Sequence, residues 1–499
     1  MSQAASRTFT GPPTVDAGSW PGAVGITTLP TLGAIALGIS AQHGHAAFYV
    51  AGALLVVALC VYVLGLRNRP ELLIVGFLIW LTVERIVVAA LAPGLDPETL
   101  RLLLGYKELF FPLLGIALLP AIAPAWRQAP PLLRVVDGLA VAFVVVVIVA
   151  LLVSSTPVLD RLVYARRLAL LPLVYGVVRL LPWRLGTVRA VAWMVIAAAL
   201  AVAAFGLLER FVAESLIWRQ WVPAAYYFHL SSLGDLSAQG TDFPVLGLPV
   251  TFWDFTGVPP ERRLVSTFLE ATTLASFLAF GAILAVATIR QRVRGIAVAG
   301  VIGVAGFLTL GKVGWLILAF GIGYVLVISV VPRLRDPAWL ASLAAALIGA
   351  LAIISLALEA SGSASGALAH FHGLRQGIES VLQAPLGRGL GIGGNFGAGT
   401  LGAESTFGVI LVQIGAIGLA MWAAWILALA FACATMGEHL RDEPLLGPAL
   451  AAALIAFFGT AALTESAGGY LGNWVYALLP AAFLSVAAHQ TVGLRPAHP

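Results

Sequence analysis

The sequence predicts an all-α integral membrane protein that crosses the bilayer many times. Hydrophobic residues make up 60% of the 499 residues and charged residues only 10%, and the mean hydropathy is +0.98. In a soluble globular protein about a quarter of the residues are charged, so this composition excludes a soluble globular protein. Apolar runs of about 20 residues recur along most of the chain, and each is long enough to cross the hydrocarbon core as a helix.

These runs indicate about 14 transmembrane helices, within a range of about 12 to 14. The expected spans lie near residues 22–42, 46–66, 70–92, 108–124, 137–155, 162–181, 190–212, 266–289, 295–311, 313–331, 338–358, 405–435, 447–464 and 474–489. The first residues are polar and lack the charged start and apolar core of a signal peptide. We therefore expect residues 1–21 to form a short cytoplasmic tail.

Arginines in the short loops predict the orientation. They fall on one side of the expected arrangement and comprise Arg67, Arg69, Arg127, Arg134, Arg184, Arg189, Arg290, Arg292, Arg294, Arg333, Arg335 and Arg441. By the positive-inside rule that side is the cytoplasm, which also receives both termini. Two segments on the outer face, residues 213–265 and 359–404, are longer than connectors need to be. They divide the chain into N-terminal helices (22–212), a central helical region (266–435) and C-terminal helices with a tail (436–499).

Two short motifs of nucleotide-binding proteins occur without the structural context that they require. Gly389, Gly391 and Gly394 satisfy G-x-G-x-x-G in the stretch "PLGRGLGIGGN", but a dinucleotide site needs a preceding strand and a soluble βαβ unit. The stretch "GFLTLGKV" has Val313 where a phosphate-binding loop needs Ser or Thr. We therefore interpret neither as a nucleotide site.

The sequence indicates no metal and no other cofactor. Cys60 and Cys433 both lie inside expected spans, which supports neither a disulfide framework nor a thiolate metal site. Neither long outer loop carries an acidic metal cluster, although Asp235, Asp242 and Asp254 are scattered through the first. The net charge of +5 follows in part from membrane topology and requires no nucleic-acid partner.

Cations gather on the outer side, against the positive-inside tendency. They comprise Arg101, Lys107, Arg161, Arg166, Arg167, Arg262, Arg263, Lys312, Arg375 and Arg388. Charges at the edge of hydrocarbon are costly unless they are paired or bind a ligand, and guanidinium groups suit phosphate oxygens. The pattern favours an anionic, membrane-embedded substrate. Alternatively, the cations extend to lipid headgroups or pair with the carboxylates of Asp96, Glu98, Glu108, Asp160, Glu209 and Glu261.

Three blocks of the sequence resemble the bacterial O-antigen ligase and polymerase superfamily. The blocks are "RRLVSTFLEATTLASFLAF" (262–280), "LTLGKVGWLIL" (308–318), and "HGLRQGIESVLQAPLGRGLGIGGNFG" followed by "ESTFGVILVQIGAIGLAMW" (372–422). Their order and spacing also match, and the resemblance covers roughly a third of the chain. Within the region 266–435, it implies that the segment 359–404 is a periplasmic loop that carries part of the site.

The resemblance implies a metal-independent glycosyltransferase of the inner membrane. Such enzymes transfer a glycan from undecaprenyl diphosphate to an acceptor hydroxyl at the periplasmic face, in exopolysaccharide or O-antigen (lipopolysaccharide) biosynthesis for the cell envelope. Arg263 matches the superfamily's arginine before its helix start, Lys312 stands where it has an arginine, and Glu404 with Ser405 stands at its His-Asn-like pair. The implied partners are the lipid-linked glycan, the bilayer, and a chain-length regulator or flippase.

Two departures from the ligase pattern favour a polysaccharide polymerase. Lys312 in place of arginine keeps the charge but loses bidentate geometry. Glu404 in place of histidine puts a carboxylate in the position of the catalytic base, and burial can raise the pKa of a carboxylate toward neutral pH. The resemblance therefore implies that Glu404 is the base and that Arg263 and Lys312 are ligands of the diphosphate.

Further substrate-binding candidates lie in and before the glycine-rich stretch. Arg375 and Arg388 are candidate phosphate ligands, and His370 and His372 are candidate acceptor ligands. The glycines predict either a nest of backbone amides that binds an anion or a tight turn leading into the next helix. The aromatic residues of 226–255 suit either sugar stacking or an interfacial belt.

A second functional class stays open. A transporter or flippase for lipid-linked or other anions would also contain embedded arginines, many helices and glycine-interrupted spans. Its charges are expected near the middle of the membrane and its two halves are expected to match. Here the charges gather toward one face and no repeat is visible, which favours the enzyme.

Overall fold

The protein is seen as a computed structural model that describes residues 29–41, 45–66, 68–91, 110–212, 253–254, 261–336, 366–393, 405–437, 443–464 and 471–493, with part of 338–349. Eight helices in these ranges are long and apolar enough to cross a membrane. The expectation of an all-α membrane protein is therefore confirmed. The expected number of spans, about 12 to 14, and the side on which each loop lies stay predictions.

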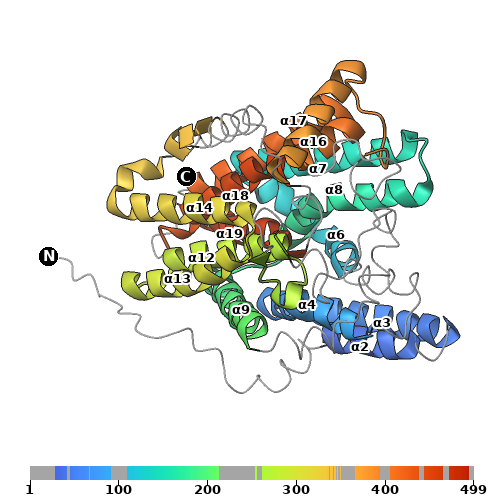
Figure 1. The fold of residues 1–499 in the computed structure, drawn as a ribbon, viewed down its shortest axis with the longest axis horizontal. Helices are drawn as coiled ribbons and strands as arrows, with labels where there is room; N and C mark the ends of the chain where they lie inside the picture. Colours follow the sequence, from blue (N-terminus) through green and yellow to red (C-terminus); the bar gives the residue numbers. More distant parts are fainter. Residues whose placement is uncertain are drawn as a thin grey trace, which may run out of the picture.

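The described helices, seen in Figure 1, overlap expected spans except for α16. They are α2 (Leu29–Ala41), α3 (His45–Leu66), α4 (Pro70–Leu91), α6 (Phe110–Gln128), α7 (Pro131–Val153), α8 (Val158–Arg179), α9 (Leu185–Phe211), α12 (Ala271–Thr288), α13 (Arg292–Leu308), α14 (Lys312–Val330), α16 (Gly366–Gln383), α17 (Thr406–Gly437), α18 (Leu446–Thr460) and α19 (Val475–Gly493). Short elements complete them: β1 (Trp253–Asp254), β2 (Glu261–Arg262), η6 (Ser266–Phe268), η7 (Pro332–Arg335), η8 (Ala461–Leu463) and η10 (Leu471–Trp474).

Helix α12 forms the centre of the packing. Its sequence is apolar on all sides, and 89% of its residues are buried, as expected for a helix enclosed by others. It packs against α9, α13, α14 and α18. By contrast, only 22% of the residues in the spanning part of α7 are buried, so α7 leaves much of its apolar surface for lipid.

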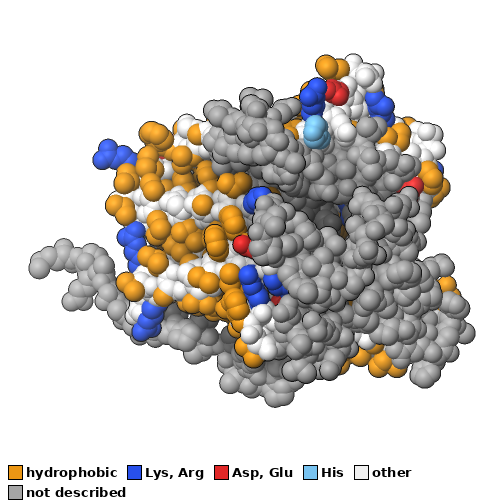
Figure 2. All heavy atoms as spheres, in the orientation of Figure 1, with side chains coloured by type: hydrophobic (Ala, Val, Ile, Leu, Met, Phe, Trp, Pro, Cys, Tyr) orange, Lys and Arg blue, Asp and Glu red, His pale blue; other side chains and the backbone are white. Residues whose placement is uncertain are grey.

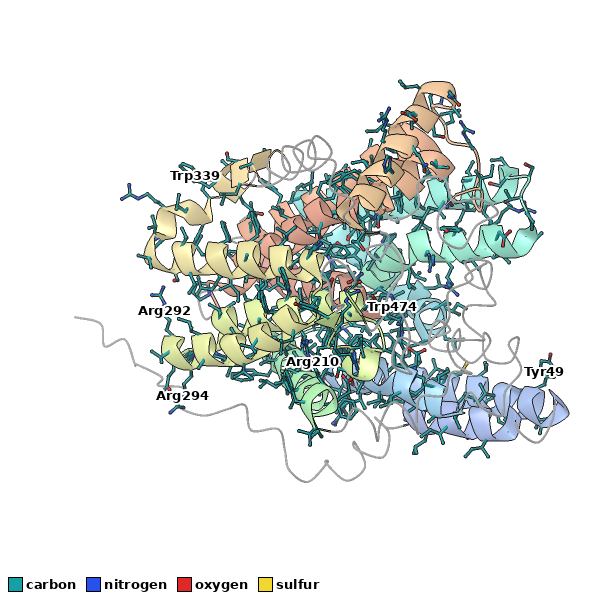
Figure 3. The ribbon with its side chains drawn as sticks, viewed as in Figure 1. Tyr49, Arg210, Arg292, Arg294, Trp339 and Trp474 are labelled. Carbon is teal, nitrogen blue, oxygen red and sulfur yellow. The ribbon has the colours of Figure 1, made fainter. Side chains whose placement is uncertain are left out.

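One end of α13 and α14 carries arginines that the sequence assigns to the cytoplasm. Arg292 and Arg294 lie in the first turn of α13, at the left edge of Figure 3. The guanidinium of Arg292 donates a hydrogen bond to Ser329 near the end of α14. Figure 2 shows hydrophobic side chains over the adjoining surface and Lys and Arg side chains at that edge, the distribution expected where helices leave a bilayer.

Helix α16 lies inside the segment that the sequence interprets as a loop. Gly373, Gly377 and Ser380 are buried along it, whereas Arg375 and Glu379 are exposed, and the buried side packs against α17. A scan for uniformly apolar runs misses such a helix because its polar face lowers the mean hydropathy. The periodicity of three and four residues is the signal that could have revealed it.

The packing of α14 on α12 depends on a glycine. A Cβ atom placed on Gly314 would lie 2.8 Å from the carbonyl carbon of Ala275 in α12, and backbone atoms cannot move aside as a side chain can. Small residues at helix contacts allow this close approach in membranes. Gly323 in the same helix faces open space, with no atom within 4 Å of an added Cβ.

Gly314 and Gly323 therefore give a matched test of this packing. Gly314→Ala should destabilise the protein by about 1–3 kcal/mol, as overpacking does. Gly323→Ala should leave stability unchanged or raise it by up to about 1 kcal/mol, because alanine favours helix. Thermal unfolding in detergent measures both, and equal melting temperatures for the two variants would contradict the close α12–α14 contact.

Candidate functional site

The glycine-rich loop packs against a break in helix α17. The helix is interrupted at Gly415, whose backbone has φ 71° and ψ −168°. The amides of Arg388 and Gly389 donate to the carbonyls of Val412 (2.7 Å) and Gln413 (3.1 Å), which an unbroken helix would satisfy by itself. In return, the amide of Ala416 donates to the carbonyl of Pro385 (3.0 Å). The loop thus completes the hydrogen bonding of the broken helix.

Glycine is required on both sides of this contact. Gly387 has φ +85°, and a Cβ atom added there would lie 2.5 Å from the carbonyl oxygen of Gln413. A Cβ atom on Gly415 would lie 2.5 Å from the carbonyl carbon of Leu386. Both the left-handed backbone and the lack of space exclude larger side chains. The turn interpretation of the glycine-rich stretch is therefore confirmed at Gly387.

Polar side chains from two other elements hold the same loop. Gln413, only 1% exposed, donates from Nε2 to the carbonyl of Gly393 (2.9 Å) and accepts from the amide of Gly391 (3.3 Å). At the turn between α7 and α8, Ser154 Oγ accepts from the amide of Leu390 (2.6 Å), and Thr156 donates to its carbonyl. The loop is thereby fixed to α17 and to the α7–α8 turn.

These contacts exclude an anion-binding nest at residues 387–391. The amide of Gly387 donates to the carbonyl of Ala384 (2.9 Å), and the next four amides donate to the carbonyls and side chains described above. An amide nest binds an anion only if its N–H groups point at the ligand. The nest interpretation is wrong for this stretch because its amides are used within the protein.

A second polar region surrounds η6, where α4, α9 and α12 meet. The arginines here donate to backbone carbonyls: Arg85 to Phe268 (3.1 Å), Arg210 to Leu308 (2.7 Å) and Arg263 to Thr309 (3.0 Å). Arg262 forms an ion pair with the fully buried Glu209. We call Arg85, Arg210, Arg262, Arg263 and Lys312 the cation cluster. Arg210 lies near the middle of the view in Figure 3.

The backbone of this region is unusual. Ser266 (φ 50°), Leu269 (φ 52°) and Leu310 (φ 52°) adopt the left-handed conformation that side chains other than glycine rarely take. The hydroxyl of Ser266 donates to the carbonyl of Val202 in α9 (2.7 Å), which holds that turn in place. Such backbone conformations persist where the surroundings fix them, and they often occur at functional sites.

Glu270 caps the start of α12 next to the cation cluster. Its two carboxylate oxygens accept from the amides of Thr272 (2.8 Å) and Thr273 (2.6 Å). Burial alone would raise the pKa of this carboxyl, but the charge of Arg85 and the amide hydrogen bonds outweigh it and lower the pKa below the ordinary value of 4.5. The carboxylate is therefore ionised at neutral pH and compensates Arg85.

Lys312 is the member of the cation cluster with the least compensation. It is exposed and is the first residue of α14, where the positive end of the helix dipole disfavours a cation by roughly 0.3–1 kcal/mol. Among the described residues, no hydrogen bond or ion pair involves its ammonium group. Arg263 donates to the carbonyl of Thr309, three residues before Lys312 in the turn that precedes α14.

The other residues that the sequence singles out lie elsewhere. Arg375 pairs with Glu379 on the exposed side of α16 (2.8 Å). Arg388 donates to Ser380 (2.9 Å) and Gln383 (2.6 Å) at the end of α16. The structure thus bonds Arg263 to the turn before α14 and places Lys312 at the first residue of that helix. Arg375 and Arg388 lie on α16 and its following loop, and no described contact joins the two pairs.

Of the candidate base and the two histidines, only His372 has a described side chain. His372 is exposed on α16. His370 belongs to the same helix, but its side chain and the whole of Glu404 lie outside the described residues, as does most of the loop 213–265. The sequence interpretation did not single out Arg85, Arg210 or Glu270; ionisable residues at or within apolar runs are the signal that could have found them.

Comparison with known proteins adds no family assignment, since no protein-family model and no curated protein matches the chain. The resemblance to the O-antigen ligase and polymerase superfamily therefore depends on the motifs quoted above.

The lowered pKa of Glu270 predicts a pH-dependent contribution to stability. A carboxyl whose folded pKa lies below its unfolded pKa stabilises the fold fully above the unfolded value, near 4.5, and this contribution disappears as pH falls through the folded value. Glu270→Gln should lower the free energy of unfolding at pH 7 by about 1 kcal/mol, as loss of a helix cap does. The difference from wild type should shrink as the pH falls below 4.5.

Thermal unfolding at several pH values measures this difference. Glu261→Gln is the matched control, because Glu261 is exposed in the same segment, and it should behave as wild type. A Glu270→Gln deficit that is equally large at pH 7 and at the lowest accessible pH would show that the charge of Glu270 is unimportant.

Proposed function

We propose that this protein is an integral-membrane glycan polymerase or ligase that uses an undecaprenyl-diphosphate donor at the periplasmic face. The observation that carries the proposal is the exposed Lys312 at the start of α14, with Arg263 bonded to the turn just before that helix. Both residues stand at positions that the resemblance assigns to phosphate binding. An anionic ligand would offset the cost of a cation at a helix N-terminus.

The proposed reaction is a displacement at the anomeric carbon of the donor glycan. The acceptor hydroxyl oxygen forms a bond to that carbon while the bond from carbon to the diphosphate oxygen breaks. The lipid diphosphate leaves with the electron pair, and the hydroxyl proton passes to Glu404. Lys312 and Arg263 neutralise the charge that develops on the leaving diphosphate, which is the largest electrostatic demand of the transition state.

The remaining cations contribute in different ways. Arg262 and Arg85 are compensated by Glu209 and Glu270, so their proposed role is to position η6 rather than to bind substrate. Arg375, Arg388 and His372 lie on and after α16, and together with His370 they are the proposed contacts to the glycan acceptor. Arg388 would exchange its hydrogen bonds to Ser380 and Gln383 for the ligand.

A transporter is the second candidate, and one observation favours it. Helices interrupted within the membrane line the substrate sites of many transporters, and α17 is interrupted at Gly415. In those sites the freed carbonyls coordinate the transported ion. In α17 the carbonyls of Val412 and Gln413 already accept from the glycine-rich loop, so the break does not by itself provide an ion site. We therefore prefer the enzyme.

Binding of the leaving group tests the role of Lys312. Purified protein in detergent should bind undecaprenyl diphosphate, and Lys312→Ala should weaken binding about 10- to 100-fold, the effect of losing one charge-assisted hydrogen bond. Lys312→Arg should retain most of the affinity because it keeps the charge. Arg294→Ala, which removes an exposed cation from the far end of α13, is the control. Equal affinities for Lys312→Ala and Arg294→Ala would reject this site.

Turnover tests the role of Glu404 separately from binding. Loss of a general base should slow glycan transfer from a lipid-linked donor by about 10²- to 10⁴-fold in Glu404→Gln protein. Its affinity for undecaprenyl diphosphate and its melting temperature should stay close to those of wild type. Near wild-type turnover would instead assign Glu404 to the helix end, where an acid contributes only about 0.3–1 kcal/mol, and would make His370 or His372 the next base to examine.

A further inference from the structure

A pocket of about 240 Å³ lies at the end of the helices that is opposite to the glycine-rich loop. The C-terminal ends of α6 and α8 and the last part of α19 line it, and its polar side chains are Gln128, Arg179 and His489. Helix α8 begins beside the loop contact at Thr156 and ends at Arg179 after 22 residues. At 1.5 Å per residue it is roughly 33 Å long, which separates the pocket from the glycine-rich loop. The pocket also shares no lining residue with the site proposed above.

Arg179 is buried in this pocket without full hydrogen bonding. Only 7% of the surface of Arg179 is exposed. One terminal nitrogen, Nη1, donates to Ser485 Oγ (3.1 Å), but Nε has no hydrogen-bond partner among the described residues. Asp137 Oδ1 lies 4.0 Å from Nε, too far for a hydrogen bond, and already accepts from the hydroxyl of Tyr175 (2.7 Å). A buried guanidinium with an unused donor predicts a ligand that accepts hydrogen bonds.

One helix end beside the pocket, that of α6, is electrostatically neutralised by a neighbouring arginine. Helix C-termini carry partial negative charge, which would disfavour an anion. Arg134 counters this at α6, because its Nε donates to the carbonyl of Ala129 (2.9 Å) and its Nη2 to the carbonyl of Arg127 (2.9 Å). Ala129 itself lines the pocket. The negative end of α6 is thus covered, and Arg179 supplies a cation to the pocket, with Asp137 at 4.0 Å from its Nε.

A second pocket adjoins the first and extends its basic character. Its volume is about 540 Å³, and its lining includes Arg69, Arg184 and Glu71. Both pockets share Pro182, which places Arg69 and Arg184 at the same end of the bundle as Arg179. Short-loop arginines of this kind mark the cytoplasmic side by the positive-inside rule.

We propose that the pocket between α6, α8 and α19 binds the phosphate group of an anionic phospholipid. The pocket lies at the ends of membrane helices, where headgroups lie, and basic pockets between such helices bind anionic headgroups. Its volume far exceeds the roughly 10–15 Å³ that one water requires. An exposed apolar stripe along α6 leads away from it and offers a surface to the acyl chains, through Ile116 (65% exposed), Leu119 (58%), Ile122 (47%) and Trp126 (45%).

Lipid titration of the purified full-length protein in an uncharged detergent tests this site. Phosphatidylglycerol should raise the melting temperature of wild type in a saturable manner, because a ligand of the folded state stabilises it, and phosphatidylcholine should not. Arg179→Gln should weaken the phosphatidylglycerol affinity about 10- to 100-fold, and Gln128→Ala or His489→Ala about 2- to 10-fold. The latter two change exposed side chains, so they keep the test valid if Arg179→Gln does not fold.

Matched controls separate binding in this pocket from general effects of surface charge and of added lipid. Arg294→Gln removes an exposed cation outside the pocket and should retain wild-type affinity. A response to inorganic phosphate that Arg179→Gln abolishes would support the same phosphate site with a soluble source, whereas a response to the lipid alone assigns it to the headgroup. Equal affinity in wild type and all three pocket variants, or equal responses to the two lipids, would overturn the proposal. None of these outcomes depends on undecaprenyl diphosphate binding at Lys312.

Discussion

Hydrocarbon offers no hydrogen-bond partner to a backbone carbonyl, so the carbonyls freed at a break in a membrane helix must find donors within the protein. The glycine-rich loop supplies those donors to helix α17. The break at Gly415 frees carbonyls that the amides of Arg388 and Gly389 then satisfy. Each such group, if left unsatisfied in an apolar environment, would cost several kcal/mol. Because two backbones must touch, both contact surfaces need glycine, at Gly387 and Gly415. The composition of the loop thus follows from the helix that it completes, before any ligand is considered.

The same hydrogen bonding limits how the protein can recognise an anion. Amides that complete α17 cannot also bind phosphate, so recognition must come from side-chain charge. Within the cation cluster that charge is unevenly compensated, since Glu209 pairs with Arg262, Glu270 compensates Arg85, and Arg210 and Arg263 donate to carbonyls at the end of α13. Lys312 is exposed and stands against the dipole of its own helix. The proposed diphosphate site is therefore argued from electrostatic cost rather than from backbone geometry.

Hydropathy predicted the membrane helices well, because their apolar surface is a local property of the sequence. The expected span 70–92 corresponds to Pro70–Leu91. Where a helix includes charged residues, hydropathy places its start too late in the sequence. The predicted span is 137–155, but α7 starts at Pro131 and includes Arg134 and Asp137. The glycines of the loop predict a tight turn from composition alone, but composition does not identify the acceptors of the loop amides. The acceptors on α17 and on the α7–α8 turn lie outside the loop, and Ser154 is 236 residues from Leu390. Glu209 is likewise 53 residues from its partner Arg262. The pairing with Glu209 was one of the alternatives that the sequence left open.

Helix α8 connects the glycine-rich loop with the basic pocket at the ends of α6 and α19. It includes Asp160, Arg161, Arg166, Arg167 and Arg179, and charges of this kind in a membrane require partners. At its start, Arg161 donates to the carbonyl of Ser154 (2.7 Å), which orders the turn whose hydroxyls hold the glycine-rich loop. At its end, Arg179 bonds to Ser485 of α19 and lies near Asp137 of α7. The partners that make the charges of α8 tolerable thus also fix the position of the loop at one end of the helix and the shape of the basic pocket at the other.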